Sequence, residues 1–259
     1  MATFRRRTGS QITLARAISK FGIASRAVAA GMIKSGRVRV NARVTKFPGL
    51  WVDLKDDTIS LDGRRLRGEK QEYLALNKPA GVVTTRSDER GRKTVYAYLP
   101  DHAQWLFPVG RLDKETSGLL LFTNDTRFGH RISDPVEGVP KTYRVEINRP
   151  LLPQDREKME KGMALAGGAA LKPAGVVMAP GNPHVFSLTV SEGRNRQVRR
   201  MCETLGYRVV SLRRTSIGSI ELGDLREGET RSLTAGERAL LMSEQANPKI
   251  HGHHRLSHR

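Results

Sequence analysis

Cysteine, aromatic residues and long hydrophobic runs are all scarce in this chain of 259 residues. Its one cysteine, Cys202, excludes an internal disulfide and fits a reducing compartment. No apolar stretch approaches the roughly 20 residues that a membrane-spanning helix needs, and no signal-type apolar run follows the basic start of the chain. We therefore expect a cytoplasmic protein that does not cross a membrane, with a packed core built from its 38% apolar residues.

Acidic residues are absent from residues 1–52, which contain eleven lysines and arginines. Over the whole chain the formal net charge is +19. A stretch of one sign repels itself unless a polyanion binds it, and basic clusters of this kind are typical of proteins that bind nucleic acid. Surplus charge that serves only solubility is the alternative interpretation.

Two helices are predicted in this acid-free region, after a flexible basic arm at residues 1–10. The first has apolar residues at helical spacing and then a glycine, which is a typical helix end: Leu14, Ile18, Phe21 and Gly22. The second begins at Ser25, a favoured N-cap residue, and runs through "RAVAAGMIKSG". We expect Val28, Met32 and Ile33 to face inward.

Short strands follow these helices. The alternation in "RVRVN" predicts one strand, and "DDTISLDGRRL" predicts another, with a turn at Asp62–Gly63. Cations on the two helices and the first strand would then lie close together: Arg16, Lys20, Arg26, Lys34, Arg37 and Arg39.

The strings "ASRAVAAGMIKSGRVRVNARV" and "ISLDGRRL" resemble an S4 domain, the small RNA-binding module of ribosomal proteins and several RNA enzymes. The resemblance implies that residues 11–70 form two helices plus short strands and that the six cations named above bind RNA. A helical hairpin with solvated cations is the alternative, and the missing acidic residues make it the weaker one.

Residues 71–245 have the pattern of a second, larger domain. Loops separate its strand candidates: "EYLALNKPAGVVTT", which enters a Lys-Pro turn, "WLFPVG", "LLLFTND", "KTYRVEI" and "HVFSLTV". "PLLPQDREKMEKGM" predicts a short helix introduced by Pro153. Residues 246–259 lack apolar periodicity and are expected to be disordered. We expect no metal site at His253 and His254, because neither thiolates nor a rigid framework lie near them in the sequence.

The segment "SEGRNRQVRRMCETLGYRVVSL" predicts an amphipathic helix with Asn195 at its start and Gly206 at its end. Its apolar face consists of Val198, Met201, Cys202 and Leu205. Cations near a helix N-terminus oppose the helix dipole, yet four arginines gather there: Arg194, Arg196, Arg199 and Arg200. We expect these charges to bind RNA phosphates or an internal carboxylate.

Three strings taken together, "GRLDKETSGLLLFTND", "KTYRVEI" and "EGRNRQVRRMCETLGYRV", resemble the RsuA-type family of pseudouridine synthases, which isomerise single uridines in ribosomal RNA. An S4 module ahead of the catalytic domain is the usual layout of that family. The resemblance therefore implies an α+β protein, with the S4 domain joined to a catalytic domain built on a mixed, mainly antiparallel sheet with flanking helices.

The family pattern also implies roles for particular residues. Its catalytic aspartate corresponds to Asp113, its active-site tyrosine to Tyr143 and its carboxylate-pairing arginine to Arg199. Leu212 corresponds to the leucine of the uracil pocket, and Arg111 lies where related enzymes displace the target base. Arg194, Arg196 and Arg200 would contact the substrate RNA.

The chemistry of the reaction fits these residue types. Pseudouridine formation breaks the N1–C1′ bond, turns the uracil and joins C5 to C1′, so no cofactor, metal or group donor is expected. An ionised carboxylate can attack the sugar or the base, or take a proton from the sugar, and the residues do not choose between these routes. We expect the guanidinium of Arg199 to keep Asp113 ionised, on a rigid mount formed by the apolar strand that follows it.

The target uridine cannot reach such a pocket from inside an RNA helix. It must be flipped out, at a cost of roughly a few kcal/mol. Tyr143 is expected to stack on the flipped base and to relay the proton lost from C5.

Three competing functions can be weighed against this one. A glycosidase would need a second carboxylate facing Asp113, and Glu115 is too near along the chain. A non-catalytic S4-type RNA-binding protein of ribosome assembly and a synthase acting on transfer RNA are both compatible with the residues. Within the family we expect large-subunit rather than small-subunit ribosomal RNA as substrate, alone or in an assembly intermediate, and a monomeric protein.

Overall fold

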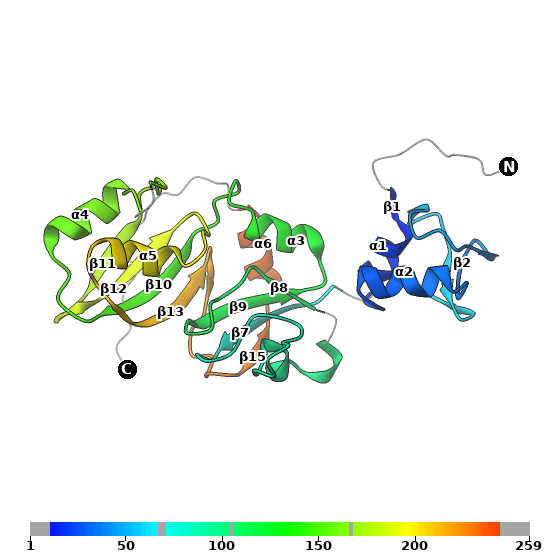
Figure 1. The fold of residues 1–259 in the computed structure, drawn as a ribbon, viewed down its shortest axis with the longest axis horizontal. Helices are drawn as coiled ribbons and strands as arrows, with labels where there is room; N and C mark the ends of the chain where they lie inside the picture. Colours follow the sequence, from blue (N-terminus) through cyan, green and yellow to red (C-terminus); the bar gives the residue numbers. More distant parts are fainter. Residues whose placement is uncertain (1–10, 67–70, 104–105, 166–167, 244–259) are drawn as a thin grey trace. The chain divides into compact units, whose positions relative to one another are not determined.

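The computed structural model describes residues 11–66, 71–103, 106–165 and 168–243 (Figure 1). The chain divides into two compact units, Met1–Gln71 and Glu72–Arg259. The predicted basic arm (residues 1–10) and the predicted tail (246–259), with His253 and His254, lie outside the described residues. Within the described ranges, every helix is too short or too polar to cross a membrane.

The first unit contains the predicted helices and short strands. Its described elements are β1 (Gln11–Thr13), α1 (Leu14–Lys20), α2 (Arg26–Lys34), β2 (Val38–Val40), β3 (Arg43–Val44), β4 (Trp51–Asp53), β5 (Ile59–Leu61) and β6 (Arg64–Arg65). Four strands form an antiparallel sheet in the order β3-β2-β5-β6, and β1 pairs with β4. The predicted turn at Asp62–Gly63 joins β5 to β6.

Helix α2 begins as predicted at Ser25, whose hydroxyl accepts a hydrogen bond from the backbone N–H of Val28 at 3.3 Å. The predicted inward face was wrong at Val28, which is 54% exposed, whereas Ala29 and Ile33 are fully buried. Ile33 is five positions after Val28, which places the two about 140° apart around a helix of ~3.6 residues per turn. Ala29 is one turn from Ile33 and therefore shares its buried face.

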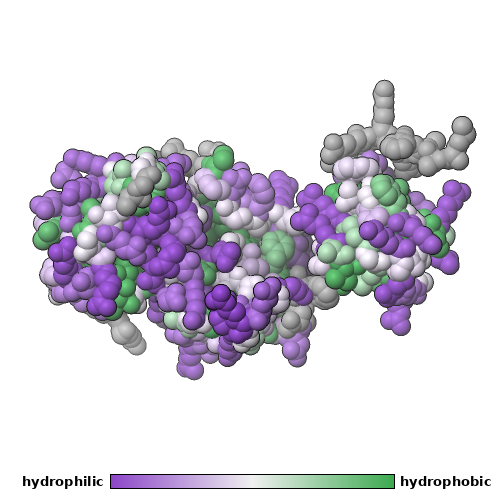
Figure 2. All heavy atoms as spheres, viewed as in Figure 1, coloured by the Kyte–Doolittle hydropathy of each residue, from purple (hydrophilic) through white to green (hydrophobic). Residues whose placement is uncertain are grey.

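All six cations predicted to bind RNA are exposed on this unit: Arg16, Lys20, Arg26, Lys34, Arg37 and Arg39. Arg37 is engaged by Asp62 of the β5–β6 turn, with a shortest N–O distance of 2.6 Å. Hydrophilic side chains cover most of the visible surface of the second unit in Figure 2, and on the first unit they alternate with less polar areas. The exposed cations are thus available to a polyanion, with Arg37 already sharing its charge with a carboxylate.

The second unit is built on a sheet with helices beside it. Its described elements are β7 (Tyr73–Lys78), the 3₁₀ helices η1 (Val95–Tyr98) and η2 (Asp101–Ala103), β8 (Phe107–Val109), β9 (Ser117–Thr123), α3 (Thr126–Ser133), β10 (Lys141–Ile147), α4 (Pro153–Lys161), β11 (Gly175–Ala179), β12 (Asn182–Val190), α5 (Gln197–Thr204), β13 (Val209–Ile217), β14 (Ile220–Glu221), β15 (Thr230–Ser232) and α6 (Ala235–Ser243).

The main strand order is β11-β12-β10-β13-β9-β7-β15, with β8 beside β9 and β14 beside β13. Neighbouring strands are antiparallel except for β13 and β9, which are parallel. This confirms the predicted mixed, mainly antiparallel sheet with flanking helices. The parallel pair brings the start of β9 beside the middle of β13, although their sequences are far apart.

Strand β9 is apolar on both faces because both faces are covered. Leu119 and Leu121 pack in a cluster with residues of α3 and α6, whereas Leu120 and Phe122 pack in another with residues of η1. Successive side chains of a strand point to opposite faces, so a strand covered on both sides has a continuous apolar run. This explains the string "LLLF" after the predicted catalytic loop.

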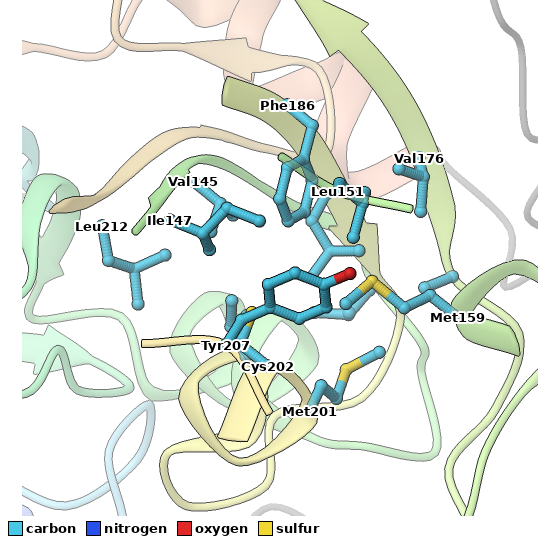
Figure 3. Close-up of a cluster of buried hydrophobic side chains, with 14 of the residues drawn as sticks. Val145, Ile147, Leu151, Met159, Val176, Phe186, Met201, Cys202, Tyr207 and Leu212 are labelled. Atoms are coloured by element: carbon cyan, nitrogen blue, oxygen red, sulfur yellow. The ribbon is translucent and has the colours of Figure 1, made fainter. Parts of the chain in front are cut away.

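A third cluster fills the space between α4, α5 and strands β10 to β13 (Figure 3). The Tyr207 ring lies among these side chains, and its hydroxyl donates to Asp155 of α4 at 2.8 Å. Met201 and Cys202 of α5 are fully buried, as their helical spacing predicts. Helix α5 is thereby fixed against the sheet, together with the arginine-rich segment that precedes it.

The predicted start of α5 at Asn195 was wrong. Arg196 is the N-cap residue, with a left-handed φ of 50° and no side-chain capping bond. Gln197, the first helical residue, instead bonds the main chain before the helix: its side chain accepts from the N–H of Arg194 at 3.2 Å, and its own N–H donates to the Arg194 carbonyl oxygen at 3.1 Å. Gly206 ends the helix as predicted, at a φ of 78°.

Candidate active site

The residues predicted for catalysis surround one cavity of about 380 Å³ in the second unit. The β8–β9 loop, strands β10 and β13, and the segment leading into α5 form its walls. Its predicted lining residues are Asp113, Tyr143, Arg199, Arg111, Leu212, Arg194 and Arg196. Arg200 was also predicted for substrate binding, but it follows Arg199 on α5 and is not among the lining residues. The volume lies within the ~300–1,000 Å³ range of pockets that enclose small ligands.

Asp113 lies on the loop between β8 and β9, and Lys78 holds that loop in place. Lys78 is fully buried, and its Nζ donates to the carbonyl oxygens of Pro79 (2.7 Å), Lys114 (3.3 Å) and Thr116 (2.8 Å). Burial lowers the pKa of Lys78 to about 8, while the charges of Glu115 and Asp113 act in the opposite direction. The ammonium group therefore ties the end of β7 to the segment that follows Asp113.

Two further contacts fix the same loop to the "NKPAGVVTT" segment. The Thr84 hydroxyl donates to the carbonyl oxygen of Leu112 at 2.8 Å. The N–H of Gly81 donates to the carbonyl oxygen of Lys114 at 2.8 Å. The main chain is thus anchored on both sides of Asp113, which a carboxylate needs if it is to meet one atom of a substrate.

The surroundings of Gly118 explain why the "TSGLLLF" string contains a glycine. It has a φ of 101°, and a Cβ built on it would overlap the carbonyl oxygen of Arg214 and lie 2.7 Å from the Arg214 nitrogen. Only glycine lets β9 approach β13 this closely. The close approach places Arg214 beside the end of the loop that carries Asp113.

The ion pair of Asp113 differs from the predicted one. Its Oδ2 lies 4.0 Å from Nη1 of Arg196, and both side chains are partly exposed. Arg199 was predicted as the partner, but its Nη2 donates instead to the carbonyl oxygen of Glu115 at 3.1 Å. Arg199 lies in the first turn of α5, where its guanidinium reaches the main chain of the loop. Arg196 precedes the helix in a left-handed conformation, and its guanidinium lies near Asp113.

Tyr143 and Leu212 lie on the neighbouring strands β10 and β13. Leu212 is buried at 5% exposure, and Tyr143 is partly buried between two hydrophobic clusters. The Tyr143 hydroxyl lies 3.5 Å from Nη1 of Arg214, the residue opposite it in the sheet. Both predicted pocket residues therefore offer an apolar surface to the cavity.

A second carboxylate in the cavity, that of Glu192, is fully engaged by the protein. It accepts from the backbone N–H of Lys172 (2.9 Å), Nε of Arg194 (3.2 Å) and Nε2 of Gln197 (3.2 Å). Glu192 is buried at 6% exposure. Its role is to hold the segment before α5, and Asp113 is left as the accessible acid of the cavity.

Several residues of the site have no counterpart in the sequence predictions: Lys78, Thr84, Lys141, Glu192 and Arg214. Lys78, Lys141 and Arg214 share one feature, a cation at a buried position of a strand. Such residues are rarely buried without a functional or structural reason. For Lys141 a signal was available in the sequence, because it shares the alternating positions of Val145 and Ile147.

The comparison with known proteins decides the family. A family model described as RNA pseudouridylate synthase matches residues 72–204, which include Asp113, Tyr143 and Arg199. The chain belongs to the RNA pseudouridylate synthase family. This confirms the family predicted from the three sequence strings.

Relatives and a solved structure agree with this family. Ribosomal large subunit pseudouridine synthase B of Bacillus subtilis (strain 168) is 35% identical over 227 residues, covering 86% of this chain and 93% of the relative. Dual-specificity RNA pseudouridine synthase RluF of Salmonella typhi is 32% identical over 251 residues, covering 93% and 84%. A crystal structure of a pseudouridylate synthase gives a TM-score of 0.66 at 32% identity and covers 89% of this chain and 99% of that one.

Proposed function

We propose that this protein isomerises uridine to pseudouridine in ribosomal RNA, with Asp113 as the reacting carboxylate. The observation that carries the proposal is the isolation of this acid: it is one-third exposed in a cavity that arginines line, and the other lining carboxylate, Glu192, is engaged by three donors. A single accessible carboxylate suits a rearrangement, whereas a glycosidase needs two that face each other.

The cavity provides groups for each requirement of the reaction. Asp113 meets the flipped nucleotide, Tyr143 and Leu212 contact the uracil faces, and Arg111, Arg194 and Arg196 meet the RNA backbone at the cavity mouth. A guanidinium near a carboxylate favours its ionised form, and Arg196 takes this place in the free protein. Arg199 and Arg200 of α5, which follow Arg196 in the chain, add further positive charge.

Ribosomal RNA of the large subunit is the substrate that the relatives support best. The printed name of the Bacillus subtilis relative specifies the ribosomal large subunit. The exposed cations of the first unit add an RNA-binding surface, in keeping with an S4 domain: Arg16, Lys20, Arg26, Lys34, Arg37 and Arg39. We expect these cations to supply affinity for phosphate and the cavity to supply the chemistry.

The test is the formation of pseudouridine in ribosomal RNA from cells that lack the protein. Purified protein should restore pseudouridine at one position of the large-subunit RNA, detected by chemical mapping. Asp113→Asn should lower the single-turnover rate by at least ~1,000-fold, because loss of a reacting carboxylate removes the chemistry and leaves binding intact. Glu115→Gln is the matched control, with the same chemical change on an exposed side chain two residues away.

Three outcomes would contradict the proposal. Tight RNA binding with no pseudouridine in any ribosomal or transfer RNA would indicate a binding protein of ribosome assembly. Product in transfer RNA alone would indicate the other substrate class. An Asp113→Asn variant as fast as the Glu115→Gln control would remove Asp113 from the chemistry.

A further inference from the structure

Two buried cations, Lys141 and Arg214, line the cavity together with Asp113. Arg214 is 4% exposed and Lys141 is 9% exposed. Within the described residues neither has an ion-pair partner, and both are anchored through main-chain carbonyl oxygens. Nε of Arg214 donates to Leu119 at 2.7 Å, and Nζ of Lys141 donates to Ile132 at 3.0 Å.

The rest of the Arg214 guanidinium is left for another acceptor. Nη1 lies 3.5 Å from the Tyr143 hydroxyl, whereas Nη2 is buried without a hydrogen-bond partner in the described structure. A buried, charged N–H group without an acceptor is costly. Lys141 is near enough for Arg214 to act, after burial, as a second cause that lowers the pKa of its ammonium group to about 8. The two side chains thus form a positive region deep in the cavity.

The reaction generates a negative charge that such a region would stabilise. When the N1–C1′ bond breaks, its electron pair passes to the uracil ring and is shared with the ring oxygens. If the carboxylate first adds to the base, the electrons of the C5–C6 double bond move to the same oxygens. Every route open to Asp113 therefore places negative charge on the uracil before C5 bonds to C1′ and releases its proton. Fixed cations in a site that excludes water stabilise such charge strongly.

We propose that Arg214, with Lys141 beside it, binds the uracil oxygens and stabilises the negative charge that develops on the ring during isomerisation. This inference rests on the function proposed above. The exposed arginines at the cavity mouth, Arg194 and Arg196, are placed for phosphates. The buried pair, Lys141 and Arg214, is therefore available to the uracil base, which enters the cavity more deeply than the RNA backbone does.

Arg214→Met removes the charge and keeps much of the side-chain volume. With saturating enzyme we expect the single-turnover rate to fall about 100- to 1,000-fold, the range for loss of one oxyanion-hole donor, with the dissociation constant for RNA nearly unchanged. Lys141→Met should act in the same direction. Arg213→Met is the matched control, because Arg213 precedes Arg214 on β13 and is exposed. Arg214→Lys should recover part of the rate.

A second substrate separates a charge effect from a structural one. Fluorine at C5 withdraws electrons and stabilises the uracil anion, so RNA with 5-fluorouridine needs less help from a cation. Chromatography measures the loss of the 5-fluorouridine nucleoside. We expect the factor by which Arg214→Met slows this reaction to be at least ~10 times smaller than the factor by which it slows uridine isomerisation. A purely structural defect would slow both substrates equally.

Equal defects on the two substrates, or an Arg214→Met variant as active as Arg213→Met, would overturn the charge-stabilising role while leaving the proposed function intact. If Arg214→Met does not fold, as judged by thermal unfolding, Arg214→Lys and Lys141→Met are compared on both substrates with the same criteria. Wild-type protein that forms no pseudouridine would overturn the proposed function itself.

Discussion

Three interior cations of the second unit, Lys78, Lys141 and Arg214, donate to main-chain carbonyl oxygens. An ion pair would neutralise them, but a carbonyl acceptor leaves the positive charge in place. Lys78 uses this charge to hold the loop that carries Asp113. Lys141 and Arg214 present theirs to the cavity. At this scale the site combines one accessible acid with several cations that have no ion-pair partner among the described residues.

The pH dependence of the rate should report Lys141. Burial, and then the charge of Arg214, lower the pKa of Lys141 to about 8, so the ammonium is charged below this pH and is lost as the pH rises through it. Stabilisation of the uracil anion should therefore be full near pH 7 and decline above pH ~8, seen as a falling single-turnover rate. The other titratable or charged groups lining the cavity are Asp113, Tyr143, Glu192, Arg111, Arg194, Arg196, Arg199 and Arg214.

The substrate and Lys78, whose pKa burial also lowers to about 8, are the same in the wild type and in the variant. Lys141→Met should therefore be slower at neutral pH and should show a smaller decline near pH ~8, while keeping any fall due to Lys78 or to uridine itself. A variant whose rate declines in parallel with the wild type would show that another group controls the alkaline limb.

At the scale of elements, one turn and one contact between strands depend on the size of single residues. The β2–β3 turn holds both Asn41 and Ala42 at positive φ, 49° and 66°. Asn41 is supported there, because its side chain bonds Asp57 at 2.7 Å and the N–H of Thr58 at 2.9 Å. Ala42 has a Cβ in the left-handed region, which costs an L-residue roughly 1–2 kcal/mol.

Ala42→Gly should therefore stabilise the first unit. Relief of the left-handed strain is partly offset by the greater freedom of glycine in the unfolded chain, which leaves a net gain of about 0.5–1 kcal/mol. The chain has one tryptophan in each unit, so urea unfolding followed by Trp51 fluorescence in a Trp105→Phe background reports the first unit. Ala27→Gly, an exposed site inside α2, should instead destabilise by about 0.5–1 kcal/mol.

Gly118→Ala tests the approach of β9 to β13. The added Cβ would meet the backbone of Arg214, which cannot move without disturbing the central sheet, so we expect a loss of at least ~1–3 kcal/mol and a lower rate. Gly181→Ala is the control, because Gly181 also has a positive φ of 70° but has open space around its added Cβ. Equal losses for the two variants in thermal unfolding would assign the effect to φ alone.

For the molecule as a whole, the charge distribution should determine how RNA binding responds to salt. The acid-free stretch of the first unit carries exposed cations that are expected to displace counterions from phosphates. Replacing Arg16, Lys20 and Arg26 by glutamine should weaken RNA binding and reduce the slope of log K against log salt by about 2, at ~0.7 for each lost phosphate contact. The single-turnover rate at saturating enzyme should change little.

A matched triple variant controls for total charge. Arg156, Lys158 and Lys161 of α4 are already paired with Glu160, Asp155 and Glu157. Glutamine at these positions removes the same formal charge, but we expect a much smaller change of slope. Equal changes in both triple variants would indicate that net charge, and not the surface of the first unit, controls binding.

Local patterns were sufficient to predict much of the protein. Helical spacing predicted α1, the α5 core residues Met201 and Cys202, and the end of α5 at Gly206, while alternation predicted β2. The strings around Asp113, Tyr143 and Arg199 predicted the family, and the matching family model confirmed it. These features depend on residues near one another in the chain, which is why a sequence reveals them.

Only the tertiary structure decided which groups meet across the cavity. The bond from Arg214 to Leu119 joins residues 95 positions apart, and the bond from Arg199 to Glu115 joins residues 84 apart. Such contacts depend on sheet register and on the direction in which a helix begins, and neither leaves a periodic trace in the sequence. The sequence by itself determined the family and many of the elements, and it predicted Asp113 as the reacting acid. Folding determined that Arg196 pairs with Asp113 and that Lys141 and Arg214 line the cavity with no ion-pair partner in the described part of the chain, because both depend on long-range packing.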